Sequence, residues 1–562
     1  MLTTWSTRVA AALLLMLAVW AFSYRLGATP LLDDPNEGEY AEVAREMVES
    51  GDWLSPQLNY VLFLNKPPLS YWAIGAAYVG FGVNEFAARL PSAVAGVVVV
   101  LLLAWLGARL YDVETGLLAG FILLATGGFF VETHEVRPDL LMTAALVGTF
   151  VALSAILAPG SKPASRWSWI GLQICVAVGL LAKGMLAVLF PGLVCVVLIV
   201  WMRRAELFVQ FLHPRAWWLL VVLMVPWHAV MSIKHPGFLW DYVINQHILF
   251  FFDRKFPRDS VPVSLPAFWE AFALRLFPWT MFVPLALLRV GRGVRSGAHA
   301  FGDRLVLAWI AAVLLFFSAA SSRMEHYSIP ALPVAALLLA RLFREYARGV
   351  STRVVTLHIV GFAVLALGGP FVVPRIVAAQ DWLTPVHELP ALAQWTFTIL
   401  AVGAVGAAAA AVAGRRAWVV PVLVGTFAVE VPLFQHGMTA MAQVNSSAGI
   451  AATIRAVVEV DDHIVYEAPV EYQNCAAFNF YLRRRLDLLR PADFVAPPYL
   501  EPYVADLFLD RDELTQLWQD DRVLFISDPL QSRATLDGIV PAPRYIVVRA
   551  GGRWVVTNLP FH

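Results

Sequence analysis

Long apolar segments recur along most of this 562-residue chain and restrict its fold more than any other feature. Each has near 20 residues, which is enough to cross the roughly 30 Å hydrocarbon core of a bilayer as a helix. Hydrophobic residues make up 59% of the chain and charged residues only 15%, whereas soluble domains average about 45–50% apolar residues. The sequence therefore predicts a mainly α-helical, polytopic membrane protein. Its spans, about thirteen, are expected near residues 8–28, 88–109, 115–132, 139–158, 167–182, 184–202, 215–233, 268–289, 303–320, 327–345, 354–374, 394–413 and 417–436.

Lys and Arg residues orient the spans, because connections on the cytoplasmic side of a membrane are enriched in positive charge. With the N-terminus cytoplasmic, nearly every basic cluster falls on that side, and an odd number of spans places the C-terminus on the opposite, outer side together with residues 31–87, 234–266 and 375–393. The first apolar segment lacks a convincing cleavage site, so we expect it to remain as a span. The basic clusters are Arg109; Lys162 and Arg166; Arg203, Arg204 and Arg215; Arg289, Arg292, Arg295 and Arg304; Arg341, Arg344, Arg348 and Arg353; and Arg415 and Arg416.

The composition changes near residue 440. Short β-branched and aromatic runs, "HIVYEAP", "RVLFIS", "RYIVVRA" and "RWVVTNL", are typical of strands. Between them, "NSSAGIAATIRAVV" and "LDRDELTQLWQ" have helical spacing, with Asn445 or Ser446 and Asp510 as candidate caps. We therefore predict a membrane domain over residues 1–439 and a small α/β domain over 440–562. The net charge of zero and the lack of a basic arm argue against a nucleic-acid partner, and three cysteines do not make a disulfide framework.

An acidic stretch, "DDPNEGEYAEVAREM" at residues 33–47, follows the first span. Asp34 is a candidate N-cap, Pro35 the first helical residue and Glu37 the acid of a capping box. The apolar residues recur at helical spacing, which predicts a short amphipathic helix along the outer leaflet. Two interpretations stay open: the acids, with Asp33, line a functional site, or Asp34 and Glu37 only cap the helix.

Lys66 lies in "LFLNKPPLSYW", directly before two prolines and a second short helix, "PLSYWAIGAAYVGFG". A lysine at the start of a helix suits an anion such as a phosphate. The alternative is a lysine that extends toward the lipid headgroups. Further polar residues are expected at the same outer side, and ionisable groups at membrane depth usually line a functional cavity. They are Glu135, Arg137, Asp139, Lys183, His247, Arg254, Lys255, Arg258, Arg323, Glu325, His326 and Tyr327.

These residue types together favour one chemistry. A carboxylate can take a proton from an acceptor, and Lys and Arg can stabilise a phosphate leaving group. The outer side of the membrane is thus expected to hold a site for transfer from a lipid phosphate. His247 taken alone is as well explained as a packing residue.

The first outer loop, "DPNEGEYAEVAREMVESGDWLSPQLNYVLFLNKPPLSYW", resembles that of bacterial relatives of the protein O-mannosyltransferases, in the C-type glycosyltransferase superfamily. It looks most like the aminoarabinose transferases that modify lipid A, and "RPD", "AKG", "SSRMEHYSIPALP" and "VVTNLP" extend the similarity. The resemblance implies an inverting transfer from a polyprenyl-phosphate sugar at the periplasmic face of the bacterial inner membrane. It implies no required cofactor and allows a divalent metal. The matching positions, which would surround the donor phosphate and the catalytic centre, are Glu37, Tyr40, Lys66, Asp139, Lys183, His247 and Tyr327.

The chain departs from that family at three positions. Asn36 replaces an aspartate, Glu39 replaces an arginine, and Asn65 stands where an acidic residue often precedes the lysine. Asparagine cannot act as a base at neutral pH, so the resemblance leaves the base among the three remaining acids; an acceptor that is itself a phosphate would need no strong base. The candidates are Asp34, Glu37 and Asp33.

The resulting hypothesis is an integral-membrane glycosyltransferase of the cell envelope, with a polyprenyl-phosphate sugar as donor and a lipid, glycan or protein as acceptor. Lys66, with Arg137 or Lys183, would hold the donor phosphate, and Tyr40 and Tyr327 would position the reacting groups. The alternative is a transporter or flippase of lipid-linked intermediates. It would require inverted repeats with paired broken helices, and the sequence shows none.

Overall fold

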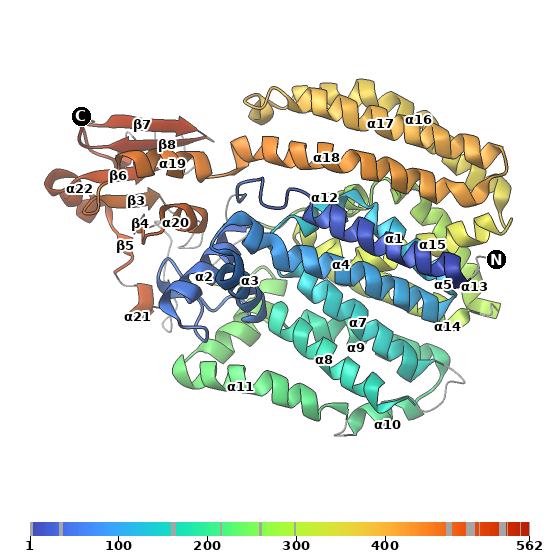
Figure 1. Ribbon diagram of the computed structural model, residues 1–562. Coiled ribbons are helices and arrows are strands. Elements are labelled where there is room, and N and C mark those ends of the chain that lie inside the picture. The colour runs from blue at the N-terminus through green and yellow to red at the C-terminus, as the bar shows by residue number, and fades with distance from the viewer. Residues whose placement is uncertain are drawn as a thin grey trace.

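The computed structural model shows a bundle of long helices with a small sheet domain attached at one end (Figure 1). We call this end of the bundle the sheet end and the opposite one, where the N-terminus lies, the far end. The described residues are 4–32, 37–158, 164–213, 216–257, 261–296, 299–467, 475–490, 501–504, 506–527, 536, 538–550 and 552–560.

The helical bundle confirms a polytopic membrane protein. Among the described residues, eight helices are long and apolar enough to cross a membrane, or ten if each of two bent pairs counts as one span. The eight are α1 (Thr4–Ser23), α4 (Glu85–Leu110), α7 (Asp139–Leu157), α14 (Ala300–Ala319), η4 (Glu325–Ala331) with α15 (Leu332–Ala347), α16 (Thr352–Ala378), α17 (Leu389–Val412), and η6 (Arg416–Trp418) with α18 (Val419–Asn445).

Three shorter apolar helices lie where further spans are predicted, namely α8 (Arg166–Ala182), α9 (Leu186–Met202) and α11 (Trp218–Lys234). The count of thirteen spans therefore stays a prediction, although each predicted segment falls on an apolar helix. The "LLAKGML" segment separates two distinct helices, α8 and α9, because Gly184 between them has a φ of +109°.

Two spans are bent, although the sequence analysis expected an unbroken helix at each of these two positions. α5 (Val113–Leu124) meets α6 (Gly127–Thr133) at 70°, and α12 (Leu265–Arg275) meets the segment formed by η3 (Thr280–Phe282) and α13 (Val283–Ser296) at 105°. The two bends contact each other, because the Gly127 N–H donates to the Phe277 carbonyl at 3.1 Å. A side chain at Gly128 would overlap the Arg275 backbone. Hydropathy alone does not detect such bends, because both arms remain apolar.

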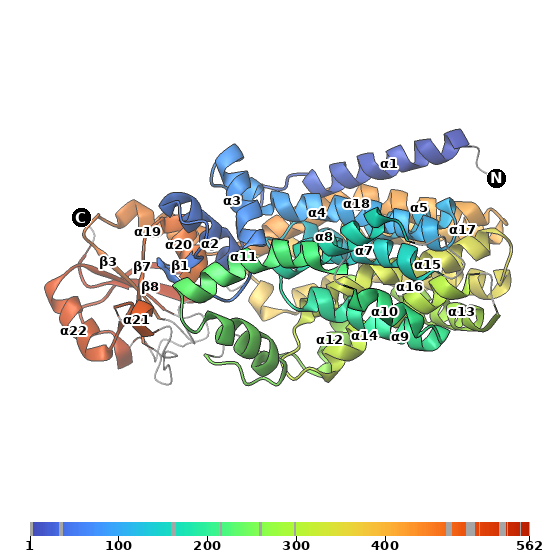
Figure 2. The ribbon, with the colours of Figure 1, turned by 90° about the horizontal axis from the view of Figure 1, so that it is seen from below.

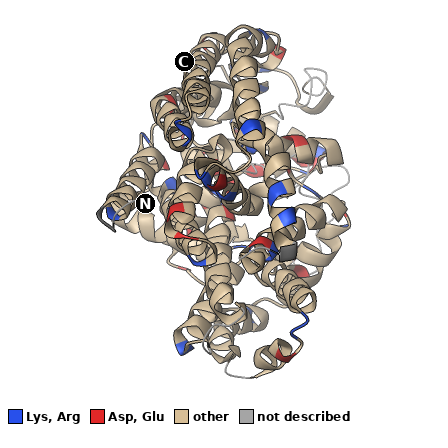
Figure 3. Cartoon of the chain, turned by 90° about the vertical axis from the view of Figure 1, so that its right-hand side faces the viewer, with Lys and Arg blue, Asp and Glu red and all other residues tan. Residues whose placement is uncertain are grey.

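The far end gathers basic residues that the sequence places on one side of the membrane. Figure 3 views this end and shows Lys and Arg together with Asp and Glu. Ion pairs connect neighbouring spans there: Arg348 contacts Asp112 at 2.9 Å, and Arg341 on α15 contacts Asp303 on α14 at 3.6 Å. The short α10 (Glu206–Leu212) also lies at this end (Figure 1).

The C-terminal residues form the predicted α/β domain. Its six-stranded sheet has the order β5-β4-β3-β6-β8-β7, parallel from β5 to β6 and antiparallel at β8 and β7. α22 (Arg511–Asp520) begins with a capping box between Asp510 and Glu513. α18 continues to Asn445, a little beyond residue 439, so Asn445 does not cap α19. Ser447 holds the N-cap position without a side-chain bond, while the Ser446 hydroxyl accepts from the Ala448 N–H at 3.3 Å. The other elements are β3 (His463–Glu467), β4 (Asp487–Leu489), β5 (Phe508–Leu509), β6 (Val523–Ile526), β7 (Tyr545–Ala550), β8 (Arg553–Thr557), α19 (Ala448–Val457), α20 (Ala476–Leu482) and α21 (Glu501–Val504).

The first loop after α1 packs directly against the sheet domain. It contains α2 (Glu37–Ser50), a hairpin of β1 (Gln57–Leu58) and β2 (Val61–Leu62), and α3 (Leu69–Phe81). Asn59 and Tyr60, with φ of 54° and 61°, form the turn of this hairpin. Apolar residues from both regions form one buried cluster, and α2 lies between α3 and the sheet domain (Figure 2).

α2 differs from the amphipathic surface helix that its sequence predicts. All residues from Glu37 to Met47 are buried, including the polar face with Glu42, Arg45 and Glu46. Arg45 bridges Glu42 on its own helix at 2.6 Å. The helix is therefore covered on both faces by protein: α20 of the sheet domain packs against it, and Tyr60 of the hairpin contacts Arg45 and Glu46 on its polar face. The proposed cap, Asp34, and Pro35 lie outside the described residues.

Candidate active site

Four of the predicted site residues line one cavity at the sheet end. Lys66 precedes α3, Lys183 lies between α8 and α9, His247 lies on the π-helical segment η2 (Trp240–Leu249), and Tyr327 lies on η4. The cavity, which we call the lysine cavity, has a volume of about 80 Å³. Its polar lining also includes Asn65, Gln246 and Ser322, and its apolar lining consists of Leu186, Phe250, Phe251, Phe316, Phe317 and Ala320.

The break between α8 and α9 places Lys183 in this cavity. Its ammonium group forms an ion pair with Asp139, the first residue of α7, and lies 5.2 Å from the centre of the Tyr327 ring. Gly184 lets the chain turn here and leaves space for His247, since a Cβ at that position would lie 2.7 Å from His247 Nε2. The predicted residues Asp139, Lys183, His247 and Tyr327 are thus assembled around one turn of backbone.

His247 is held at both ring nitrogens. Nδ1 lies 2.5 Å from the Tyr242 carbonyl oxygen, so it carries the proton and donates. Nε2 accepts from the Met185 N–H at 3.2 Å. Burial and the nearby charge of Lys66 lower the pKa of His247, against the hydrogen bond to Tyr242, so the ring is neutral. In this arrangement His247 fixes the cavity wall to the α8–α9 turn.

Arg137 and Tyr40 lie outside the lining of the lysine cavity but close to Asp139, whose charge acts on both. Arg137 bonds Glu135 at 2.8 Å, and the Tyr40 ring stacks on Tyr71 with 5.8 Å between centres. Burial raises the pKa of Tyr40, and Asp139 adds to the effect, so its hydroxyl keeps the proton. Burial opposes the charge of Arg137, but the surrounding carboxylates raise its pKa above the usual value. A permanent positive charge therefore lies near the Asp139–Lys183 pair.

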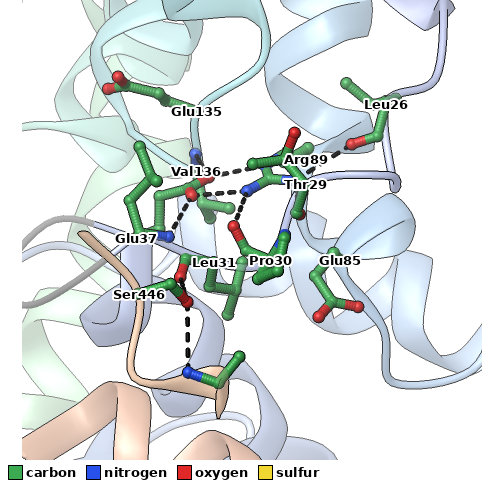
Figure 4. Close-up of polar contacts among 12 residues, drawn as sticks. Leu26, Thr29, Pro30, Leu31, Glu37, Glu85, Arg89, Glu135, Val136 and Ser446 are labelled. Carbon is green, nitrogen blue, oxygen red and sulfur yellow. Dashed lines mark hydrogen bonds and ion pairs between the residues drawn. The ribbon is translucent and has the colours of Figure 1, made fainter. Parts of the chain in front are cut away.

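Glu37 is fully buried, and its carboxylate is occupied by four hydrogen bonds (Figure 4). Arg89 donates to both oxygens, at 2.8 and 2.7 Å, and the N–H groups of Leu32 and Val136 donate at 2.8 and 2.9 Å. Arg89 also donates to the Leu26 and Pro30 carbonyls, at 3.2 and 3.0 Å. Glu37 thus joins α2, α4 and the loop before Arg137.

Arg89, the buried partner of Glu37, is a residue that the sequence analysis missed. The sequence does contain a signal for it, namely an arginine within an apolar span. Such an arginine needs a buried partner, because a lone charge in the membrane is costly. The hydropathy of "EFAARLPSAV" conceals it, since the neighbouring residues are small and apolar.

Asp33 and Asp34 lie outside the described residues, and the chain on both sides of them is fixed. The Leu31 N–H donates to the Tyr481 hydroxyl oxygen at 2.7 Å. Ser446 Oγ donates to the Leu31 carbonyl at 2.5 Å, and both residues are labelled in Figure 4. Glu37 fixes the other side. The chain is therefore held by hydrogen bonds on both sides of Asp33 and Asp34, and on one side the partner belongs to the sheet domain.

Two of the three positions at which the chain departs from the resembled family are placed, whereas Asn36 lies outside the described residues. Asn65 is buried beside Lys66, and its Oδ1 accepts from Gln246 Nε2 at 2.9 Å. Glu39 is buried on α2. Within the described ranges no group of three or more His, Cys, Asp or Glu side chains is arranged to hold a metal ion.

Comparison with known proteins finds similarity to one protein family and to several curated relatives. Residues 9–243 match the family model described as dolichyl-phosphate-mannose-protein mannosyltransferase. The chain is 26% identical over 388 residues to an undecaprenyl phosphate-alpha-4-amino-4-deoxy-L-arabinose arabinosyl transferase of Serratia proteamaculans, covering 65% of this chain and 66% of that protein, so the match spans just under two thirds of the relative. A Pseudomonas paraeruginosa protein of the same description is 28% identical over 69% of each chain.

The fold has a close counterpart among solved structures. The crystal structure of ArnT from Cupriavidus metallidurans bound to undecaprenyl phosphate superposes with a TM-score of 0.83, at 22% sequence identity and 98% coverage of both chains. The similarity extends over the membrane domain and the sheet domain alike, so the two share one architecture.

Proposed function

Because the chain is related to the protein mannosyltransferases over residues 9–243 and to the aminoarabinosyl transferases over about two thirds of its length, we propose that it is an integral-membrane glycosyltransferase. It moves a sugar from a polyprenyl-phosphate donor to an acceptor that is a lipid A-like lipid, a glycan or a protein. The observation that carries the proposal is the lysine cavity, which Lys66 and Lys183 line together with four phenylalanines. This combination of positive and apolar groups suits a prenyl phosphate, which has an anionic head on an apolar chain.

The residues of the lysine cavity and their neighbours then have defined tasks. Lys66 binds the donor phosphate as a point charge, and Lys183, held by Asp139, adds a second charge together with Arg137. Tyr327 and Tyr40 position the sugar and the acceptor. His247 and Glu37 are positioning residues, since their polar atoms are already engaged.

The reaction is a single displacement with inversion. The acceptor oxygen attacks the anomeric carbon, the bond from that carbon to the phosphate oxygen breaks, and the phosphate leaves with the electron pair. Asp34 takes the acceptor proton; Asp33 is the alternative base. The positive groups stabilise the charge that grows on the phosphate as the bond breaks.

The orientation follows from the basic far end, which we place in the cytoplasm, with the sheet end in the periplasm. A reporter fused after residue 562 should therefore be active only in the periplasm. Activity in the cytoplasm would reverse the placement of the site.

The transfer itself is tested by mass spectrometry of envelope lipids and polysaccharides from cells with and without the gene. The expected result is one species heavier by one sugar residue, lost in Asp34→Asn. A flippase would change the membrane side of the lipid-linked sugar without producing that species. The two bent helix pairs make this comparison worthwhile, since broken helices also occur in transporters.

A further inference from the structure

A second and larger cavity shares η4 with the lysine cavity as part of its lining. Tyr327 lines the lysine cavity, whereas Glu325, two residues earlier, lines this one. The second cavity has a volume of about 580 Å³ and is enclosed by α6, α12, η4, α17 and α18. We call it the acidic cavity. η4 therefore contributes a residue to the wall of each cavity.

The charge of the acidic cavity is opposite to that of its neighbour. Among the described residues that line it, Arg275 is the one cation. Arg275 is already engaged, because its Nη1 donates to the Glu325 carbonyl at 3.0 Å and its Nε lies 3.4 Å from Glu132. Five carboxylates line the same space, namely Glu132, Glu135, Glu270, Glu325 and Glu430. An anionic headgroup would be repelled here.

Two of these carboxylates have buried oxygens without a partner. Glu430 lies within the apolar α18, its residue is 4% exposed, and its Oε1 has no hydrogen-bond partner among the described residues. Glu132 is 3% exposed, and its Oε2 likewise has no hydrogen-bond partner among the described residues. An unpaired buried acceptor is costly, and an ionisable residue at membrane depth usually faces a ligand. These oxygens therefore lack a donor that a ligand can supply.

The rest of the wall is apolar, which restricts the ligand further. Aliphatic and aromatic side chains from α12, α17 and α18 complete the cavity, while the exposed Glu270 marks its open side. A bare metal ion would not use such a wall, and no three metal-ligating side chains are grouped within the described part of the chain. The apolar members include Leu274, Phe277, Phe397, Leu400, Phe427 and Phe434.

We propose that the acidic cavity binds an amphipathic molecule with a protonated amino group, such as an amino-sugar lipid, and that this molecule is the acceptor. The acceptor assignment rests on the proposed transferase function, whereas the amine recognition does not. Glu430 and Glu132 accept hydrogen bonds from the ammonium group, and the apolar wall contacts the hydrocarbon chain. A hydroxyl of the same molecule then faces the donor across the edge of η4.

The recognition is tested by calorimetry on the full chain in lipid nanodiscs, with two probes that differ only in charge: octyl 2-amino-2-deoxyglucoside and its N-acetyl derivative. The amine should bind at least about 10-fold more tightly, which is the usual scale of a charge-assisted hydrogen bond. Glu430→Gln and Glu132→Gln should each remove most of that preference. The matched control is Glu388→Gln, a half-exposed acid before α17 that pairs with His436 at 3.0 Å and should leave it unchanged.

Equal affinity for the two probes, or a preference that survives both Gln variants, would overturn the amine assignment. So would displacement of the amine by millimolar magnesium chloride, which would identify a cation site instead. Wild-type protein alone decides the first comparison, so a variant that folds poorly does not obscure it.

The acceptor role is tested separately with octyl 2-amino-2-deoxyglucoside as the substrate. Glu430→Gln should raise the KM for this amine about 10-fold with kcat unchanged, whereas Lys66→Ala should impair transfer and leave binding of the amine intact. Binding without transfer to the probe, in protein that glycosylates a native acceptor, overturns the acceptor role. Binding in protein that transfers no sugar to any acceptor would instead reject the transferase function.

Discussion

At the scale of single residues, the acids of the first loop separate into two kinds. Glu37, which matches a family position, is engaged on both oxygens by Arg89 and two backbone N–H groups. Its carboxylate accepts from four donors and has no exposed surface, so it links elements of the fold rather than facing a substrate. Asp34 and Asp33 are the acids that remain as the base in our proposal.

Glu37→Gln should therefore destabilise the fold, and any loss of turnover should follow from the loss of folded protein. Removing one partner leaves Arg89 charged and buried, which typically costs about 3–5 kcal/mol. We expect a lower thermal midpoint in detergent and a low yield, partly restored by the double variant Glu37→Gln, Arg89→Met. A Glu37→Gln protein with unchanged thermal midpoint and no turnover would show that Glu37 acts as acid or base.

Glu46 gives a prediction for pH. Its carboxyl is buried, and burial together with Glu42 raises its pKa well above the ordinary 4.5, so the folded protein holds a proton that the unfolded chain releases. Stability therefore falls as pH rises above about 4.5. Glu46→Gln keeps the neutral form at every pH, so this part of the decline should disappear and the variant should gain on wild type at alkaline pH. Thermal midpoints measured from pH 5 to 9 check it; a constant difference across that range would contradict it.

At the scale of elements, the sequence predicts what depends on local patterns. Apolar stretches, the α8–α9 break at Lys183 and the capping box at Asp510 all follow from residues close together in the chain. The bends at residues 124–127 and 275–280 do not, because they depend on one apolar helix packing against another. The buried polar face of α2 is missed for the same reason.

Gly184 tests whether the α8–α9 turn shapes the lysine cavity. Gly184→Ala places a methyl group 2.7 Å from His247 Nε2 at a φ of +109°, so His247 and Lys183 should move and donor affinity should fall several-fold. Gly171→Ala is the matched control in α8, because a Cβ there meets nothing within 4 Å. It should be neutral or stabilise by about 0.5–1 kcal/mol. Equal donor affinity in both variants would mean that the turn does not shape the cavity.

At the scale of the whole molecule, the sheet domain is part of the construction of the site. Asn59 donates to the Leu486 carbonyl and accepts from the Leu486 N–H, both at 2.9 Å, and Asn479 donates to it at 2.7 Å. Tyr481 holds the Leu31 N–H before the acidic loop. These contacts join residues more than 400 positions apart, so no periodicity or spacing could predict them. The sequence located the domain, and only the structure shows that it docks on the first loop.

The candidate site shows the same division. The residue types and their shared side of the membrane followed from composition and resemblance, and the structure brings Lys66, Lys183, His247 and Tyr327 into one cavity. The sequence analysis missed Arg89 and the acidic cavity, because the partners of these buried charges lie on other elements and no local pattern predicts them.

The central claim is that the lysine cavity binds a donor phosphate, and titration of transfer against polyprenyl-phosphate sugar with Lys66 variants tests it most directly. Lys66→Ala should lose about 10- to 150-fold in donor affinity or turnover, the range for a contact to an ionised group, and Lys66→Arg should recover part of the loss. Lys234→Ala, which removes a half-exposed lysine paired with Asp52 at 3.0 Å, is the control and should leave the curve unchanged. A Lys66→Ala curve that coincides with wild type would contradict the account.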